Sequence, residues 1–396
     1  MAQSLTSSGP PTGGWHHEIG YNDPARTTRS MASTRFGCRR PMVNMQDTRV
    51  RIVDNVHISA FEPLRPPRQI KLRLPLTEEV SQTIYEARQV IRAVLRREDP
   101  RLLAVVGPCS VHDPVAALDY AKRLHEAHER YKDRLFIIMR VYMEKPRTTI
   151  GWRGLINDPH LNGSYDMNEG LYRARELLLR VSAMGLPTAT EMLDPISPHY
   201  ISDVVSLAAI GARTVESQTH RALASGISMP VGYKNGTNGD VLVAVQAYLS
   251  AIHSHSFLGI DEDGMSCVVK TTGNPDGLII LRGSKQGPNY DAETIARTEE
   301  MMRSAGLTPA MMVDCSHANS GSDYTRQEHV WNTVIEHHLR HHDSVVGMMV
   351  ESNLFEGKQN IPANLADLRY GVSITDGCVG WETTERMLDA AYRALG

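Results

Sequence analysis

The sequence predicts a (β/α)8 barrel with an N-terminal extension and an inserted β-hairpin. From Leu102 onward, eight short apolar runs alternate with longer segments of helical periodicity. Most of these runs are apolar almost throughout, as expected for parallel strands that are buried on both faces. An open, doubly wound sheet is the alternative, but the chain contains no G-x-G-x-x-G or Walker loop to favour it. Eight β/α units fit a closed barrel.

The predicted strands and helices alternate along the chain. The strands are expected over residues 102–107, 136–142, 187–193, 213–217, 230–235, 277–282, 310–316 and 344–352. The helices are expected over residues 114–131, 167–184, 198–209, 220–225, 239–253, 292–305, 323–341 and 382–395.

Two further segments do not belong to a bare barrel. Residues 266–272 are predicted to form an extra strand before the turn sequence GNPDG at 273–277, which gives a hairpin before the sixth barrel strand. Residues 55–76 are expected to be extended and to lead into a helix over 77–97.

This organisation predicts three regions. Residues 1–45, rich in Ser, Thr, Gly, Pro and Arg, are expected to be a disordered tail without a secretory signal. Residues 46–100 are expected to be an extension that makes regulatory or oligomer contacts. Residues 101–396 are expected to be the catalytic barrel. Met31, Met42 and Met45 are alternative starts of the chain.

Composition excludes several classes of partner. The net charge is −3, so nothing indicates binding to nucleic acid or to a membrane surface. No apolar stretch approaches the roughly 18 residues that a membrane span needs. The five cysteines are scattered, which favours a reducing, cytoplasmic location.

Four cations accompany the predicted strands where a barrel holds its active site. They are Arg140, Arg213, Lys234 and Arg282. A buried, unpaired cation is costly, so each one pairs with a local carboxylate or binds an anionic ligand. Their convergence at the mouth of one barrel favours an anionic ligand, because arginine suits phosphate and carboxylate.

A second group carries metal-binding side chains. It consists of Cys109, His317, Glu351 and Asp376. Each alone has an ordinary explanation, such as a core cysteine, a hydrogen-bonded core histidine or a helix cap. Together, one thiolate, one imidazole and two carboxylates suit one divalent transition metal ion, namely Mn, Fe, Co or Zn.

Eight stretches carry a resemblance to a known family. They are 107–114 (GPCSVHDP), 139–149 (MRVYMEKPRTT), 151–160 (GWRGLINDPH), 210–218 (IGARTVESQ), 231–237 (VGYKNGT), 279–283 (IILRG), 314–320 (DCSHANS) and 373–376 (SITD). In them the chain resembles the type I 3-deoxy-D-arabino-heptulosonate-7-phosphate (DAHP) synthases, from about residue 55 to the C-terminus. The resemblance implies condensation of phosphoenolpyruvate with erythrose 4-phosphate, at the entry to aromatic amino-acid synthesis.

The resemblance also implies roles for single residues. Cys109, His317, Glu351 and Asp376 would be the metal ligands, and Arg140, Arg213, Lys234 and Arg282 would hold phosphoenolpyruvate. Lys145, Arg147, Thr148 and Thr149 would meet erythrose 4-phosphate. Glu191, with Lys234, is the candidate to orient the water that adds during the reaction. A homo-oligomer, dimer or tetramer, is expected.

Two other functions stay open from the sequence. One is the sibling reaction with arabinose 5-phosphate, against which stand residues 145–148 and the long segment 266–277. The other is a regulatory paralogue without activity, against which stands the presence of every residue with a chemical role.

Feedback inhibition by tyrosine is the last expectation from the resemblance. The matching effector positions are Pro198, Leu223, Ile227, Ser228, Phe257 and Gly259, with Asp54 and Asn55 from a neighbouring subunit. Phenylalanine-sensitive relatives tend to carry Ser where this chain has Gly259, and glycine leaves room for a phenol oxygen. The sequence 55–58 (NVHI) also resembles the tyrosine-sensitive group. The alternative is that Gly259 only serves a turn.

Overall fold

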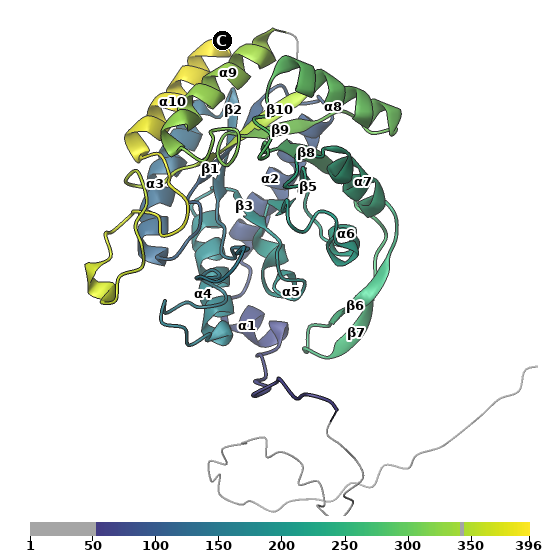
Figure 1. Ribbon diagram of the computed structural model, residues 1–396, viewed down its shortest axis with the longest axis vertical. Coiled ribbons are helices and arrows are strands. Elements are labelled where there is room, and N and C mark those ends of the chain that lie inside the picture. The colour runs from purple at the N-terminus through teal and green to yellow at the C-terminus, as the bar shows by residue number, and fades with distance from the viewer. Residues whose placement is uncertain (1–52, 341–343) are drawn as a thin grey trace, which may run out of the picture. The chain divides into compact units, whose positions relative to one another are not determined.

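Eight parallel strands close into a barrel, as the sequence predicts, in the order β1-β10-β9-β8-β5-β4-β3-β2 (Figure 1). This computed structural model describes residues 53–340 and 344–396. The barrel strands are β1 (Leu102–Gly107), β2 (Leu135–Arg140), β3 (Thr188–Glu191), β4 (Leu207–Ile210), β5 (Val231–Lys234), β8 (Gly277–Leu281), β9 (Met311–Asp314) and β10 (Val345–Glu351). Every residue of these strands is buried, which explains their continuous apolar sequences.

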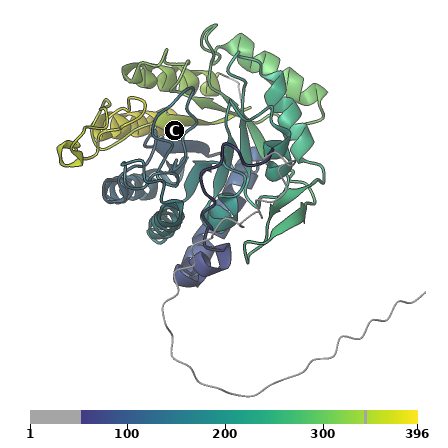
Figure 2. The ribbon, with the colours of Figure 1, turned by 60° about the horizontal axis from the view of Figure 1, so that its bottom comes forward.

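The helices surround the strands (Figure 2). They are α3 (Pro114–Tyr131), α4 (Met167–Ser182), α5 (Pro198–Ile201), α6 (Gln218–Ala224), α7 (Leu242–Ala251), α8 (Ala292–Ser304), α9 (Gln327–Leu339) and α10 (Trp381–Ala394), with short 3-10 turns at Ser202–Val204, Tyr324–Arg326 and Leu365–Asp367. Local sequence sets where they begin. At α3, for example, the Asp113 carboxylate accepts from the Val115 amide at 2.8 Å and Pro114 occupies the first turn.

A helix before the barrel, α2 (Glu78–Leu95), covers the end at which the strands begin. Its buried Ala87, Ile91 and Val94 share one apolar cluster with Leu103 of β1 and Leu278 of β8. Because this end is closed by apolar packing, the opposite end, where the strands finish, is the one that can hold a site.

The predicted hairpin before the sixth barrel strand is present, but its turn lies at residues 261–265 rather than at 273–277, and its first strand was not predicted. Strands β6 (Ser256–Ile260) and β7 (Ser266–Lys270) pair antiparallel outside the barrel, between β5 and β8 in the sequence. The hairpin tip is tied to the short helix α1 (Pro67–Arg73), since Arg68 forms an ion pair with Asp263 at 2.7 Å and Lys71 forms one with Glu262 at 2.7 Å.

Two predictions of local structure were wrong. The fourth strand is Leu207–Ile210, which the helix prediction over 198–209 had included, whereas residues 213–217 form turns held by the carbonyls of Gly211 and Thr214. Burial inside the barrel makes Ala208 and Ala209 good strand residues despite their helical propensity. Residues 55–76 are not extended throughout, because Pro67 begins the helix α1.

The chain divides into two units, Met1–Phe61 and Glu62–Gly396, and the barrel with α1, α2 and the hairpin belongs to the second. The predicted tail over residues 1–45 lies outside the residues that the structure describes. None of the described helices is long and apolar enough to cross a membrane.

Candidate active site

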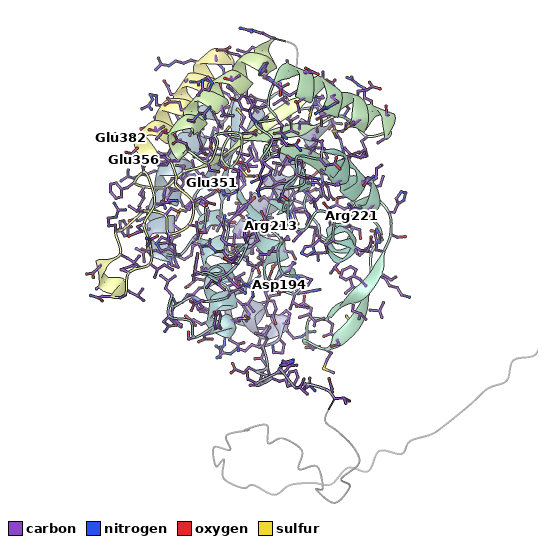
Figure 3. The ribbon with its side chains drawn as sticks, viewed as in Figure 1. Asp194, Arg213, Arg221, Glu351, Glu356 and Glu382 are labelled. Carbon is purple, nitrogen blue, oxygen red and sulfur yellow. The ribbon has the colours of Figure 1, made fainter. Side chains whose placement is uncertain are left out.

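A cavity of about 790 Å³ opens at the ends of the barrel strands. Residues that follow β2, β3, β4, β5, β8, β9 and β10 line it, so one cavity collects side chains from distant parts of the sequence. In Figure 3, Glu351 and Arg213 lie near the centre of the ribbon, inside the helices, while Glu382 lies at the margin.

Three of the four predicted metal ligands come together at this mouth. One ligand atom each of Cys109, Glu351 and Asp376 lies within 4.8 Å of the others. The fourth, His317, stands next to them with its Nε2 atom 3.9 Å from Glu351 Oε1. Burial, and then the nearby Glu351 carboxylate, raise the pKa of the Cys109 thiol to about 12. The donor set of sulfur, imidazole and carboxylate fits a divalent transition metal ion.

The backbone at His317 is unusual. Its φ is 56°, in the left-handed region that few residues other than glycine adopt. Such conformations tend to occur where a functional site requires one side-chain direction. Here the Nδ1 atom is hydrogen-bonded to the Ser316 hydroxyl at 2.7 Å and lies 3.0 Å from Asp314 Oδ2, while Nε2 is on the side of Glu351.

The four predicted cations fall into two pairs. Arg140 is fully buried and donates to Glu351 Oε1 at 2.9 Å, and Lys234 lies between Glu191, at 3.5 Å, and Asp314, at 3.6 Å. Arg140 and Lys234 therefore have local carboxylate partners, which the sequence had left open as the alternative to an anionic ligand. Among the described residues, Arg213 and Arg282 have no carboxylate partner, and Arg213 donates to the Thr148 hydroxyl at 3.2 Å. An anion can therefore reach both guanidinium groups in the cavity.

The loop after β2 forms another wall. Arg147, Thr148 and Thr149 line the cavity, as does the buried Lys145. The Lys145 ammonium group lies 3.2 Å from the Cys109 sulfur and 3.3 Å from the Cys109 carbonyl oxygen. The sugar-phosphate loop of the prediction thus adjoins the predicted metal ligands.

Sequence reasoning gave no role to three charged residues of this site. Lys285 and Arg326 also line the cavity, and Asp314 contacts both His317 and Lys234. The signal used for the other cations would have found Lys285, since it lies three residues after Arg282 in the same loop. Arg326 lies in a 3-10 turn twelve residues beyond β9, too far from the strand for that signal.

Glu191 and Asp314 stay charged although both are buried. Burial alone would raise the pKa of each carboxyl, but Lys234 lowers that of Glu191, and His317 and Lys234 hold that of Asp314 well below its usual range. The mouth therefore contains buried charges of both signs in contact, an arrangement typical of functional sites.

The predicted effector positions lie away from the mouth. Pro198 begins α5, Leu223 lies in α6, Ile227 and Ser228 follow α6, and Phe257 and Gly259 lie in β6. Gly259 lies inside strand β6 and is not one of the described glycines with a positive φ. The alternative that it serves a turn is therefore wrong. Asp54 and Asn55 fall in the separate unit Met1–Phe61, and their part in an effector pocket stays a prediction.

Comparison with known proteins gives a consistent result. The DAHP synthetase I family matches residues 78–389. The chain is 48% identical to the Tyr-sensitive phospho-2-dehydro-3-deoxyheptonate aldolase of Escherichia coli over 343 residues, 87% of this chain and 96% of that protein. It is also 48% identical to the Phe-sensitive enzyme of the same species, over 86% of this chain and 97% of that protein.

A solved structure agrees with these relatives. Phospho-2-dehydro-3-deoxyheptonate aldolase from Francisella tularensis superposes with a TM-score of 0.83 at 44% identity, and the match covers 85% of this chain and 98% of that one. Its close similarity includes the barrel that brings the site residues together. The resemblance seen in the motifs is confirmed, and the chain belongs to the DAHP synthetase I family.

Proposed function

We propose that the protein joins phosphoenolpyruvate to erythrose 4-phosphate, with addition of water and release of phosphate, to give DAHP. One observation carries this proposal: a single cavity is lined by His317 and Asp376, which adjoin the buried Cys109 and Glu351, and by arginines that have no carboxylate partner among the described residues. Its relatives are named for this activity. The reaction is a transferase step at the entry to the shikimate pathway of aromatic amino-acid biosynthesis.

The division of the cavity supports separate places for the two substrates. Arg140, Arg213, Lys234 and Arg282 are proposed to hold the carboxylate and phosphate of phosphoenolpyruvate. Arg147, Thr148 and Thr149, on the loop after β2, are proposed to hold the phosphate of the aldehyde sugar. Arginine matches both groups because its planar fork of donors binds two oxygens at once.

The metal would be held by Cys109, His317, Glu351 and Asp376. These residues would hold a divalent ion that, when bound, would supply Lewis-acid polarisation of the aldehyde oxygen. The carboxylates of Glu351 and Asp376 come from the end of β10 and the loop after it, next to the Cys109 loop, so the barrel itself sets the spacing of the donors.

The chain's own side chains support each bond change. The C3 carbon of phosphoenolpyruvate bonds to the aldehyde carbon, and the aldehyde oxygen takes a proton, for which the buried Lys145 ammonium is the candidate donor. Water adds its oxygen at C2 and loses a proton, oriented by Glu191 and Lys234, whose charged groups are 3.5 Å apart. The bond from C2 to the phosphate oxygen then breaks as the new C2 hydroxyl gives up its proton and becomes a carbonyl, and the cationic side chains stabilise the departing phosphate.

The identity of the aldehyde is tested by the product. Metal-reconstituted protein is mixed with phosphoenolpyruvate and either erythrose 4-phosphate or arabinose 5-phosphate, and the sugar product is identified by mass spectrometry. We expect a seven-carbon sugar acid phosphate with the first aldehyde. An eight-carbon product with the second would indicate the sibling reaction, and no product with either would indicate a paralogue without activity.

We infer, second, that tyrosine is the feedback inhibitor. Overall similarity does not decide this, because the Tyr-sensitive and Phe-sensitive relatives are equally identical to the chain. The surroundings of Gly259 favour tyrosine. A Cβ atom at this position would lie 2.8 Å from Val269 Cγ2, too close without a shift of that valine, and 3.5 Å from His199 Nε2, so a serine here would crowd the surroundings that glycine leaves uncrowded.

His199 provides a polar group beside that space. Its Nε2 atom is buried and has no hydrogen-bond partner among the described residues. Burial, with the charge of Lys71, lowers the pKa of this imidazole, so it is neutral at neutral pH and can bond a phenol hydroxyl. Phenylalanine would leave the atom without a partner, which disfavours it.

Assembly and location are proposals of the same kind. Leu258 is 85% exposed and Val268 is 59% exposed on the hairpin, which supports its burial in a homo-oligomer, dimer or tetramer. Free, scattered cysteines and metabolic substrates support a cytoplasmic location.

A further inference from the structure

Asp314 touches two parts of the site that have separate tasks in the proposed function. It ends strand β9 and is fully buried. Its Oδ2 atom lies 3.0 Å from Nδ1 of His317, a proposed metal ligand, and 3.6 Å from Nζ of Lys234, a proposed phosphoenolpyruvate contact. Its Oδ1 atom accepts from the Ser316 hydroxyl at 2.6 Å and from the Ser316 amide at 3.1 Å.

The contact with His317 determines which ring nitrogen is available. Nδ1 lies 2.7 Å from the Ser316 oxygen and 3.0 Å from Asp314 Oδ2, so both neighbours favour a ring proton on Nδ1, which leaves the Nε2 lone pair on the side of Glu351. The Ser316 hydroxyl gives its hydrogen to Asp314, so its oxygen, 2.7 Å from Nδ1, can share the same ring proton. A carboxylate behind a ligating imidazole orients the ring and raises its affinity for metal.

The contact with Lys234 fixes the other group. Lys234 ends β5, and its ammonium group lies between Asp314 from β9 and Glu191 from β3. All three side chains are buried, so the lysine has little freedom to move. Two carboxylates from different strands therefore set where the ammonium points.

We infer that Asp314 is a positioning residue that couples metal binding to phosphoenolpyruvate binding through His317 and Lys234. The inference rests on the proposed function, which makes His317 a metal ligand and Lys234 a substrate contact. Since one carboxylate serves both, each ligand changes the environment of the residue that binds the other. Coupling of this kind is reciprocal: phosphoenolpyruvate alters metal affinity by the same factor as metal alters phosphoenolpyruvate affinity.

The test is Asp314→Asn, which keeps the shape and removes the charge. Metal affinity is measured by equilibrium dialysis without substrate, and phosphoenolpyruvate affinity is measured on metal-free protein. We expect metal affinity to fall by about 10–100-fold, as for other partners behind a metal ligand. Phosphoenolpyruvate affinity should fall as well, and the linkage between the two ligands should disappear.

Two matched variants separate the contacts. Glu191→Gln removes a carboxylate from Lys234 without touching His317, so it should weaken phosphoenolpyruvate and leave metal affinity within about twofold. Ser316→Ala touches Asp314 and His317 but not Lys234, so it should weaken metal only. Equal effects of Glu191→Gln on both ligands would show that the linkage does not run through Asp314.

The wild-type protein gives a measurement that does not depend on how a variant folds. Selective ¹⁵N labelling of histidine, with His317→Gln to assign the signal, reports which ring nitrogen carries the proton in the metal-free protein. The inference requires protonated Nδ1. A ring proton on Nε2 alone, or Asp314→Asn with unchanged metal affinity, overturns it. Metal binding by wild type and its loss in Cys109→Ser test the proposed metal site separately.

Discussion

The barrel mouth and the β6–β7 hairpin place their side chains in opposite ways. At the mouth, charged groups such as Arg140, Glu191 and Asp314 are buried and in contact with one another. On the hairpin, apolar groups such as Leu258 and Val268 are exposed, and Gly259 has no side chain at all. The difference indicates that the mouth is built for charged substrates and the hairpin for apolar partners. A substitution on the hairpin should therefore leave turnover in the absence of amino acids unchanged. A substitution at the mouth should leave the choice of effector unchanged.

The largest expected effect is the loss of metal content and turnover when a proposed metal ligand is replaced. Cys109→Ser replaces a thiolate with a poor ligand, so metal content and turnover should both fall, by more than the roughly 10–100-fold typical of residues behind a ligand. Metal content per chain and turnover are measured on the same preparation. Wild-type values of both in this variant would remove Cys109 from the site.

The next largest effect is expected from truncating a cation that is proposed to hold phosphoenolpyruvate. Arg282→Ala should weaken binding or turnover of phosphoenolpyruvate by about 2–5 kcal/mol, the range for truncating a desolvated charge contact. Arg297→Ala is the matched control, because Arg297 is an exposed arginine on α8 that does not line the cavity. An Arg282 variant within about twofold of wild type would mean that this residue does not touch the substrate.

Buried charge at the mouth should also have a cost in stability. Glu144, next to Lys145, is buried and accepts from the Ser197 hydroxyl at 2.8 Å, and burial raises the pKa of its carboxyl from 4.5 to about 7. Between these two values the folded state binds more protons than the unfolded state, so stability falls as pH rises and the loss is complete above the folded pKa.

Glu144→Gln removes this dependence. The free energy of unfolding of the variant, relative to wild type, should therefore rise by roughly 3 kcal/mol between about pH 4.5 and about pH 8. Denaturant unfolding of both proteins at the two pH values measures the change. A constant difference between them would show that Glu144 does not carry this titration.

The sequence predicted features that follow from local pattern and missed features that follow from burial or three-dimensional contact. Strand ends such as Arg140, Lys234 and Glu351 could be placed because apolar runs end in conspicuous charges, and barrel topology gathers those ends. The strand β4 was missed because Ala208 and Ala209 take their conformation from burial rather than from propensity. Asp314 could be placed at a strand end. Its contacts with Lys234 on β5 and with His317 in the loop after β9 could not be predicted, because they arise only in the folded structure.

The smallest expected effect is on effector choice. Gly259→Ser should lower the preference for tyrosine over phenylalanine by about tenfold, since the side chain enters the space beside Val269 and His199. His199→Leu should act in the same direction without adding bulk near Gly259. Inhibition curves with tyrosine, phenylalanine and tryptophan measure this. Stronger inhibition of wild type by phenylalanine, or unchanged selectivity in both variants, would contradict the tyrosine proposal.

Phosphate release upon mixing phosphoenolpyruvate with erythrose 4-phosphate tests the central claim most directly, when wild type, Cys109→Ser and Gly259→Ser are compared in parallel with added divalent metal. We expect wild type and Gly259→Ser to release phosphate at similar rates in the absence of amino acids, only when both substrates are present, and we expect no release from Cys109→Ser. Release that continues in Cys109→Ser, or a wild-type protein that releases none, would contradict the assignment of the barrel mouth as the catalytic site.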